Sequence, residues 1–333
     1  VVAVSKDVES ADLLVAKYVD YGVTVKAADD AREIVAGKFE TRATEDEHKL
    51  QKLIIKEDIE GSWIERATTI EFPSWVKVRD VKVNKADKIT NIKTSDDITA
   101  FTVNKNRNVV EFTPAISGGK AKLELTFYVS VEADAEGDIT AVVSSRGLDE
   151  DYEVVLGKAV APVKVETNPT NVKVGVQNQE IGKITLSEIA AGSFIKGEEV
   201  VIALEDDFRW KEEPTVKVVE GDLRIDRVKT DKEYLTFEVT RESSKPSVIE
   251  ITDGRVDLYR HLPEGEFKVY VGGEAIVQNY EGYVAKADED YAFKTRWAAK
   301  PVVANIITPA PGETTTPEVV LTIGSTTMFV DGV

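Results

Sequence analysis

The feature that most constrains the fold of this chain is an internal duplication. The segment KLIIKEDIEGSWI at 52–64 returns as KITLSEIAAGSFI at 183–195, and AEGDITAVV at 135–143 returns as PEGEFKVYV at 263–271. The first alignment pairs Glu57 with Glu188, Gly61 with Gly192, Ser62 with Ser193 and Trp63 with Phe194. A chain that carries one pattern twice is expected to fold as two copies of one domain, and its length also suggests about two domains.

The second copy can be followed to the end of the duplicated region. DKITNIKTSDDITAFTV at 87–103 resembles DLRIDRVKTDKEYLTFEV at 222–239, and the letters DEDY occur at both 149–152 and 288–291. Aligning the two DEDY segments places Pro162 on Pro301. We therefore predict four regions. They are an N-terminal segment at 1–36 that is a candidate exchanged strand, repeat 1 at 37–169, repeat 2 at 170–306, and a Pro/Thr linker with a C-terminal strand or hairpin at 307–333.

Hydrophobic residues in both copies alternate with polar ones. Such alternation over short segments, bounded by Gly, Asp and Lys, is typical of antiparallel sheets with one buried face. The predicted fold class is all-β, with two tandem antiparallel β-sandwich (Ig-like) domains and extended terminal strands. Helix is expected only at 10–19 and 29–37. The alternating residues of 215–240 are Val216, Val218, Leu223, Ile225, Leu235, Phe237 and Val239, and those of 120–133 are Leu123, Leu125, Phe127 and Val129.

The composition argues against several classes of function. The chain has no cysteine, which removes disulfides, zinc–thiolate sites and thiol nucleophiles, and its two histidines, His48 and His261, are far apart in sequence. A formal net charge of −18 offers no basic surface to nucleic acid. The longest apolar runs fall short of the ~20 residues that span a bilayer. We expect no cofactor and no catalytic residues, and therefore no enzyme.

Cation and sugar binding are weaker alternatives. The acidic runs at 45–49, 149–152 and 204–207 could hold Ca²⁺ weakly, but none has the spacing of a dedicated calcium loop, and solvated turns are the simpler interpretation. The chain has 4 tryptophans, which could form a platform on which sugars stack. Because Trp63 aligns with Phe194, we expect the tryptophans to lie in the core or at an interface.

The second copy resembles repeats of a known family. IGKITLSEIAAGSFIKGEEVVIAL at 181–204, PTVKVVEGDLRI at 214–225 and HLPEGEFKVYVGG at 261–273 are similar to repeats in secreted clostridial-type bacterial surface proteins. Those proteins commonly end in a copper amine oxidase N-terminal-like domain, and VVLTIGSTTMFVDGV at 319–333 looks like the opening hairpin of that domain. The resemblance implies an exported surface protein with tandem β repeats. No functional residue is carried over, because that domain is non-catalytic and no quinone-forming tyrosine motif is matched here.

The C-terminal tail has no domain left to complete. ITPAPGETTTPE at 307–318 is an extended Pro/Thr-rich linker, and the segment after it is apolar at Val320, Ile323, Met328 and Val330. An isolated two-stranded hairpin is only marginally stable in water. The tail is therefore disordered, folded back on its own chain, or paired with an open sheet edge of a neighbouring subunit. VVAVS at 1–5 is a second candidate for the same role.

Three functions follow, and the first is preferred. The chain is predicted to be a structural subunit of an extracellular filament or surface layer, a homopolymer assembled head to tail by β-strand donation. The alternative is a monomeric surface adhesin or carbohydrate-binding protein that binds cell wall or surface polysaccharide, with Trp210, Tyr259 and Tyr270 as its aromatic row. A glycosidase with paired carboxylates is the third. No leader precedes Val1, so we expect the mature chain of an extracellular, cell-surface protein whose signal peptide has been removed.

Overall fold

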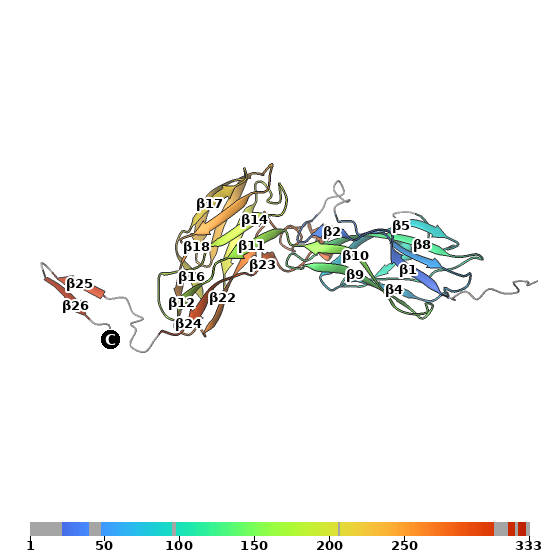
Figure 1. The fold of residues 1–333 in the computed structure, drawn as a ribbon, viewed down its shortest axis with the longest axis horizontal. Coiled ribbons are helices and arrows are strands. Elements are labelled where there is room, and N and C mark those ends of the chain that lie inside the picture. The colour runs from blue at the N-terminus through green and yellow to red at the C-terminus, as the bar shows by residue number, and fades with distance from the viewer. Residues whose placement is uncertain are drawn as a thin grey trace, which may run out of the picture.

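The computed structural model describes residues 22–39, 48–94, 98–205 and 207–309, and two further strands at 319–323 and 326–330. These residues form β-strands and two 3-10 helices, η2 (Ile98–Ala100) and η3 (Lys286–Tyr291), with no α-helix among them. Figure 1 shows two β-sandwiches joined end to end. The predicted all-β class with two tandem antiparallel sandwiches is confirmed.

The first sandwich packs a 4-stranded sheet against a 6-stranded sheet. In sheet order the smaller one is β1 (Val23–Ala27), β3 (Leu53–Glu57), β8 (Lys122–Val131) and β5 (Val76–Asp87), and the larger one is β2 (Arg32–Val35), β10 (Tyr152–Val160), β9 (Gly137–Ser145), β4 (Thr68–Glu71), β7 (Val109–Phe112) and β6 (Thr102–Val103). Neighbouring strands are antiparallel except β2 and β10. On β9 the buried side chains are Ile139, Ala141 and Val143, which alternate as predicted.

The second sandwich repeats this arrangement. Its smaller sheet is β11 (Val163–Thr167), β14 (Ile184–Glu188), β20 (Val248–Thr252) and β17 (Thr215–Glu220), and its larger sheet is β12 (Thr170–Lys173), β24 (Val302–Ile307), β22 (Gly265–Gly272), β15 (Glu199–Leu204), β19 (Tyr234–Arg241) and β18 (Arg224–Asp231), with β23 (Trp297–Ala299) also paired to β22. The order matches the first sandwich strand for strand, including the parallel pair β12–β24. A small sheet is added, with β13 (Gln179–Glu180), β21 (Arg255–Leu258) and β16 (Phe208–Glu212).

A buried glutamate anchors the same loop in both copies. Glu57 ends β3, and its carboxylate accepts the backbone N–H of Trp63 at 2.9 Å and that of Ala121 at 2.6 Å. Glu188 ends β14 in the same way and accepts the N–H of Phe194 at 3.3 Å. Trp63 and Phe194 are both in the core. The alignment of these residues in the sequence therefore reflects one loop structure that occurs twice.

The two DEDY segments do not occupy equivalent positions. DEDY at 149–152 closes the turn between β9 and β10, whereas DEDY at 288–291 lies in η3, inside the long connection from β22 to β23. The pairing of β9 with β10 and of β22 with β24 aligns Pro162 with Pro309 rather than with Pro301. The duplication is real in the topology, but this particular match of letters is not part of it.

The start of the first sandwich differs from the sequence prediction. β1 and β2 lie before Gly37 and are members of its sheets, and the second sandwich begins with β11. The helix expected at 29–37 is wrong, because this segment contains β2, which pairs with β10 and buries Ile34. The predicted helix at 10–19 and the candidate strand at 1–5 lie outside the described residues.

The connection at 273–296, here called the junction arm, links the second sandwich to the first. Asn279 is fully buried, and its amide donates hydrogen bonds to Ser130 Oγ at 3.0 Å and to the carbonyl oxygen of Val131 at 2.7 Å, both on β8. The backbone N–H of Gln278 donates to the carbonyl oxygen of Gly37 at 2.7 Å. The junction arm is thus anchored in the first sandwich.

Aromatic rings of the arm pack on cations of the first sandwich. The Arg107 and Arg79 guanidinium groups lie 4.5 and 5.5 Å from the ring centroid of Tyr291, the last residue of the second DEDY. Lys77 lies 5.0 Å from the Phe293 ring centroid and donates a hydrogen bond to the carbonyl oxygen of Ala292. Cations over aromatic faces are worth about 0.5–1 kcal/mol each when exposed and more when buried. These contacts hold the two sandwiches in one orientation.

Candidate functional site

The segment predicted to join subunits forms a sheet of its own. β25 (Val319–Ile323) contains Val320 and Ile323, and β26 (Thr326–Val330) contains Met328 and Val330. The two strands pair antiparallel, and no other described strand joins their sheet. The role of these four residues as an inter-subunit strand stays a prediction.

One open sheet edge lies on β17, which pairs only with β20. Val219 on this strand is 48% exposed, and among the described residues it is the exposed large hydrophobic side chain that lies on an edge strand. The edge strand β18 is lined by Arg224, Arg227 and Lys229 and has two bulges in its pairing, whereas β17 has one, at Val219. Charges and bulges protect an edge from further pairing. β17 is therefore the better acceptor for an added strand.

The tryptophans do not form an exposed platform. Trp63 and Trp210 are buried, Trp75 packs against the first core, and Trp297 is half-buried with its ring centroid 5.6 Å from that of Tyr270. The predicted aromatic row of Trp210, Tyr259 and Tyr270 is wrong, because Trp210 belongs to the second core. Its side chain cannot reach a ligand on the surface.

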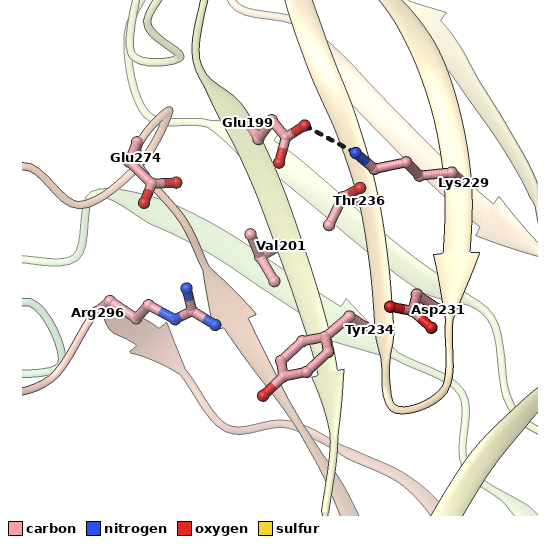
Figure 2. A pocket seen from close by; sticks show the side chains of 8 residues that line it. All are labelled: Glu199, Val201, Lys229, Asp231, Tyr234, Thr236, Glu274 and Arg296. Atoms are coloured by element: carbon pink, nitrogen blue, oxygen red, sulfur yellow. Dashed lines mark hydrogen bonds and ion pairs between the residues drawn. The ribbon is translucent and has the colours of Figure 1, made fainter. Parts of the chain in front are cut away.

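A pocket does exist on the outer face of the larger sheet of the second sandwich (Figure 2). Thr236 of β19 is paired with Val201 of β15 on one side and with Lys229 of β18 on the other, so three strands form the floor. Glu274 and Arg296, from the two ends of the junction arm, stand at the side. The cavity volume is 290 Å³. None of these residues was singled out from the sequence as a site.

The charged groups of the pocket are unevenly paired. Lys229 Nζ donates to Glu199 Oε1 at 3.3 Å. The Arg296 guanidinium instead lies on rings, 4.7 Å from the Trp297 centroid and 5.8 Å from that of Tyr234. No carboxylate of the described residues forms an ion pair with Arg296. The guanidinium also donates a side-chain hydrogen bond to the Tyr280 hydroxyl, so part of its fork is left for an anionic group.

The hydroxyls at this site differ in their partners. The Tyr280 hydroxyl donates to Glu274, and burial together with this hydrogen bond raises the pKa of Tyr280 to about 12. Thr236 Oγ1 is buried and has no hydrogen-bond partner among the described residues. A buried polar atom without a partner is costly unless a ligand or water satisfies it.

A second hollow of 790 Å³ lies where the sandwiches meet, and Lys38, His48 and Ile189 line it. Lys38 Nζ donates to the carbonyl oxygen of Ser193 at 2.7 Å across the junction, and burial lowers the pKa of Lys38 to about 8. Burial, reinforced by the positive charge of Arg79, lowers the pKa of His48 to about 4. Both groups contribute to the junction between the sandwiches.

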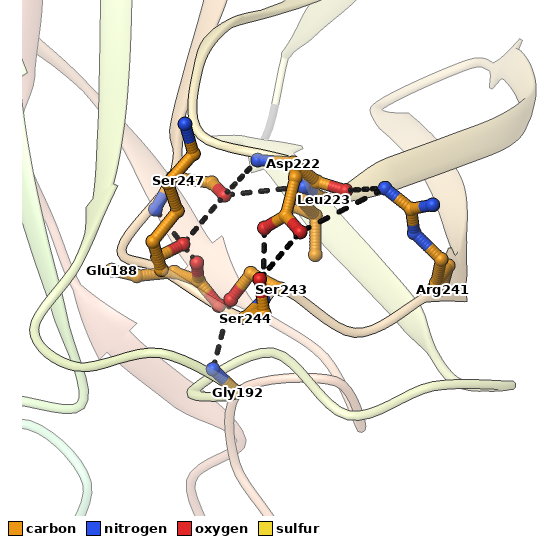
Figure 3. Close-up of polar contacts among 9 residues, drawn as sticks. Glu188, Gly192, Asp222, Leu223, Arg241, Ser243, Ser244 and Ser247 are labelled. Carbon is orange, nitrogen blue, oxygen red and sulfur yellow. Dashed lines mark hydrogen bonds and ion pairs between the residues drawn. The ribbon is translucent and has the colours of Figure 1, made fainter.

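A polar cluster above β14 has a structural role (Figure 3). Ser247 donates its backbone N–H to Glu188 at 2.8 Å, and its Oγ accepts the N–H groups of Asp222 and Leu223, both at 3.2 Å. The Ser244 hydroxyl donates to Asp222 at 2.7 Å and the Ser244 backbone N–H donates at 2.8 Å, and these two hydrogen bonds lower the pKa of that carboxyl. These hydrogen bonds join the loop that contains Asp222 to the loop that contains Ser244 and Ser247. It fixes loops and offers no open site.

Two of the acidic runs contribute to a turn and to an ion pair, and residues 45–47 of the third lie outside the described residues. Asp149 of the first DEDY accepts the Tyr152 hydroxyl at 2.5 Å, and Asp207 lies 3.1 Å from His261. Among the described residues no group of three or more His, Asp or Glu side chains could hold a metal ion. No helix in the described part of the chain is long and apolar enough to cross a membrane.

No protein-family model and no curated protein matches the chain. It is similar to the C-terminal domain of the antigen I/II polypeptide BspA of Streptococcus agalactiae, at 10% identity over 75% of this chain and 95% of that one, with a TM-score of 0.28. It is also similar to the collagen binding domain of the Erysipelothrix rhusiopathiae surface protein RspB, at 8% identity over 86% and 93%, with a TM-score of 0.27. The major pilin subunit BcpA of Bacillus cereus matches at 9% identity over 86% and 69%, with a TM-score of 0.25.

These neighbours are bacterial surface adhesin and pilin domains. At such TM-scores the likeness assigns neither a family nor a ligand to this chain. The resemblance to clostridial-type surface proteins stays a prediction.

Proposed function

We propose that the protein is a structural subunit of an extracellular filament or surface layer, assembled head to tail by β-strand donation. The observation that carries the proposal is the C-terminal hairpin, in which β25 and β26 pair with each other and with no other described strand. Two strands alone are marginally stable in water, so a hairpin of this kind gains most by joining a larger sheet.

The acceptor in this proposal is the β17 edge of the next subunit. Its unpaired backbone groups supply hydrogen bonds to an added strand, and exposed Val219 supplies an apolar contact. Donor and acceptor are different surfaces, so the contact does not close on itself and propagates a polymer. The anchored junction arm supports the proposal, because a subunit that bears load along its length needs its two sandwiches held together.

Deletion of 307–333 tests the proposal. The intact chain is expected to form long assemblies in sedimentation and electron microscopy, and the deleted chain is expected to stay monomeric. A second variant, Val219→Lys, is expected to shorten the assemblies by placing a charge on the acceptor edge. Its matched control is Val155→Lys, since Val155 is 38% exposed but lies on the inner strand β10. Unchanged assemblies after the deletion would exclude the tail as the connector.

The second candidate function is a monomeric surface adhesin that binds cell wall or surface polysaccharide. The pocket of Figure 2 favours it, because it places an exposed tyrosine beside hydrogen-bonding groups. A stable monomer that sediments with isolated cell wall would support this candidate over the polymer. We assign no reaction to the protein in either case, and place it outside the cell.

A further inference from the structure

We propose that the pocket between β15, β18, β19 and the junction arm binds a single sugar residue that carries a carboxylate. This inference is independent of the assembly proposed above, because β17 lies in the other sheet of the same sandwich. The volume of 290 Å³ is at the low end of ligand pockets, which run from about 300 to 1,000 Å³. A site of this size suits one ring better than a long chain.

The pocket belongs to the second sandwich alone. Its floor is formed by strands β15, β19 and β18, which have equivalents in the first sandwich. Its wall is formed by Glu274 and Arg296 of the junction arm. The corresponding connection in the first sandwich, between β9 and β10, is the short turn at 146–151. The longer connection of the second copy therefore supplies the enclosing side of the site.

Arg296 points to the charge of the ligand. Its guanidinium lies near the rings of Trp297 and Tyr234, at 4.7 and 5.8 Å from their centroids, and donates to the Tyr280 hydroxyl, without an ion pair to any described carboxylate. A guanidinium fork binds a carboxylate through two parallel hydrogen bonds, and the rings fix its plane before the ligand arrives. The pocket thus offers one ordered cationic group.

The remaining groups point to a hydroxylated ring. Tyr234 is 40% exposed and presents a ring face, which suits the C–H face of a sugar. Asp231 and Glu199 are carboxylates that accept hydrogen bonds from hydroxyls, and Thr236 Oγ1 is a buried atom with no partner among the described residues. An acidic amino-acid side chain would pair with Arg296, but it has no hydroxyl groups to donate hydrogen bonds to Asp231 and Glu199. A uronic acid supplies hydroxyl donors and a carboxylate together.

Titration of the full chain with glucuronate, followed by ligand-observed NMR and calorimetry, tests this proposal. Glucose serves as the neutral ring and glutamate as the carboxylate without a ring. We expect glucuronate to bind at least about tenfold more tightly than either, in line with the strength of paired hydrogen bonds to an ion. Equal binding of glucose would overturn the role of the carboxylate, and equal binding of glutamate would identify an acidic peptide as the ligand instead.

Variants locate the site. Arg296→Gln and Tyr234→Ala are each expected to weaken glucuronate binding by about tenfold or more, and Arg296→Lys to weaken it less, because the charge stays but the fork is lost. Tyr259→Ala is the matched control, since Tyr259 is 42% exposed and lies outside the pocket. A thermal unfolding curve of each variant confirms that it is folded. Loss of binding in the Tyr259 variant, or none in the Arg296 variants, would place the ligand elsewhere and reject the proposal.

Discussion

The two sandwiches share one strand order but differ in the connection that precedes their last strand. In the first it is the short turn at 146–151, and in the second it is the junction arm at 273–296. The arm contacts the first sandwich through Asn279 and Tyr291, and it supplies Arg296 to the pocket. A duplicated framework can therefore keep its core while one longer loop provides contacts between the copies and one wall of a pocket.

The same comparison shows that both sandwiches contain a buried glutamate that anchors a loop. In each copy a glutamate at the end of the second strand of the smaller sheet binds the loop that follows it, and a large aromatic side chain from that loop enters the core. Glu57 is completely buried, whereas Glu188 is 6% exposed and its bond to Phe194 is longer. The anchor of the first copy is the tighter of the two.

The largest effect is therefore expected from Glu57→Ala. Removing the carboxylate leaves the buried N–H groups of Trp63 and Ala121 without a partner, at about 1–3 kcal/mol each, so the free energy of unfolding should fall by about 4 kcal/mol. The matched change Glu188→Ala should cost less, about 3 kcal/mol, because this carboxylate is nearer to solvent. Urea unfolding followed by tryptophan fluorescence measures both losses.

Glu111→Ala is the control for this pair, since Glu111 faces solvent on β7. Its substitution should change the free energy of unfolding by less than about 0.5 kcal/mol. Losses below 1 kcal/mol for both buried glutamates would mean that water replaces the carboxylates, and the shared anchor would then have no energetic meaning.

The sequence predicts the framework better than the site. Period-two alternation and the paired residues Glu57 with Glu188 reflect local strand structure and a local loop, which short segments encode. The pocket depends on the pairing of Thr236 with Val201 and on the position of Arg296 beside these strands, and contacts between such distant segments have no signal in a single sequence. The separation of matched segments grows from 131 residues (52 to 183) to 139 residues (149 to 288), which does signal an insertion, but the repeated DEDY letters conceal where it lies.

The next largest effect is expected from acid, which should lower the stability of the first sandwich through His48. Burial and the charge of Arg79 lower the pKa of His48 from 6.5 to about 4 in the folded state. Between pH 6.5 and pH 4 the unfolded chain binds more protons at His48 than the folded chain does. The free energy of unfolding is therefore unaffected by this group above pH 6.5 and falls as the pH is lowered towards 4. The loss amounts to about 3 kcal/mol. His261, the other histidine of the chain, lies exposed beside Asp207 in the second sandwich.

This loss is checked by measuring the free energy of unfolding at pH 7 and at pH 4 for the natural chain and for His48→Gln. The variant should lose about 3 kcal/mol less over this interval, because it has no group to protonate at that position. Identical pH dependence in the two chains would show that carboxylates alone control acid stability.

A smaller effect is expected at the junction. Asn279→Ala removes the hydrogen bonds to Ser130 and Val131, which should lower the coupling between the sandwiches by about 2 kcal/mol. The loss is limited because Asn279 Oδ1 is itself buried without a partner among the described residues. Calorimetry should show one transition for the natural chain and two for the variant. A single transition in both would mean that the aromatic and cation contacts suffice.

The smallest effect tests how alike the two anchored loops are. Gly61 and Gly192 have φ of 79° and 75°, and nothing lies within 4 Å of a Cβ placed on either one. Changing each to Ala therefore adds only the strain of a left-handed backbone, about 1 kcal/mol, and the two losses should be equal. Changing each glycine to Asn should lower the free energy of unfolding by less than the change to Ala does, because Asn adopts the left-handed conformation more readily. Unequal losses in the thermal unfolding of the two Ala variants would show that the loops have diverged in their backbone, although their anchoring glutamates have not.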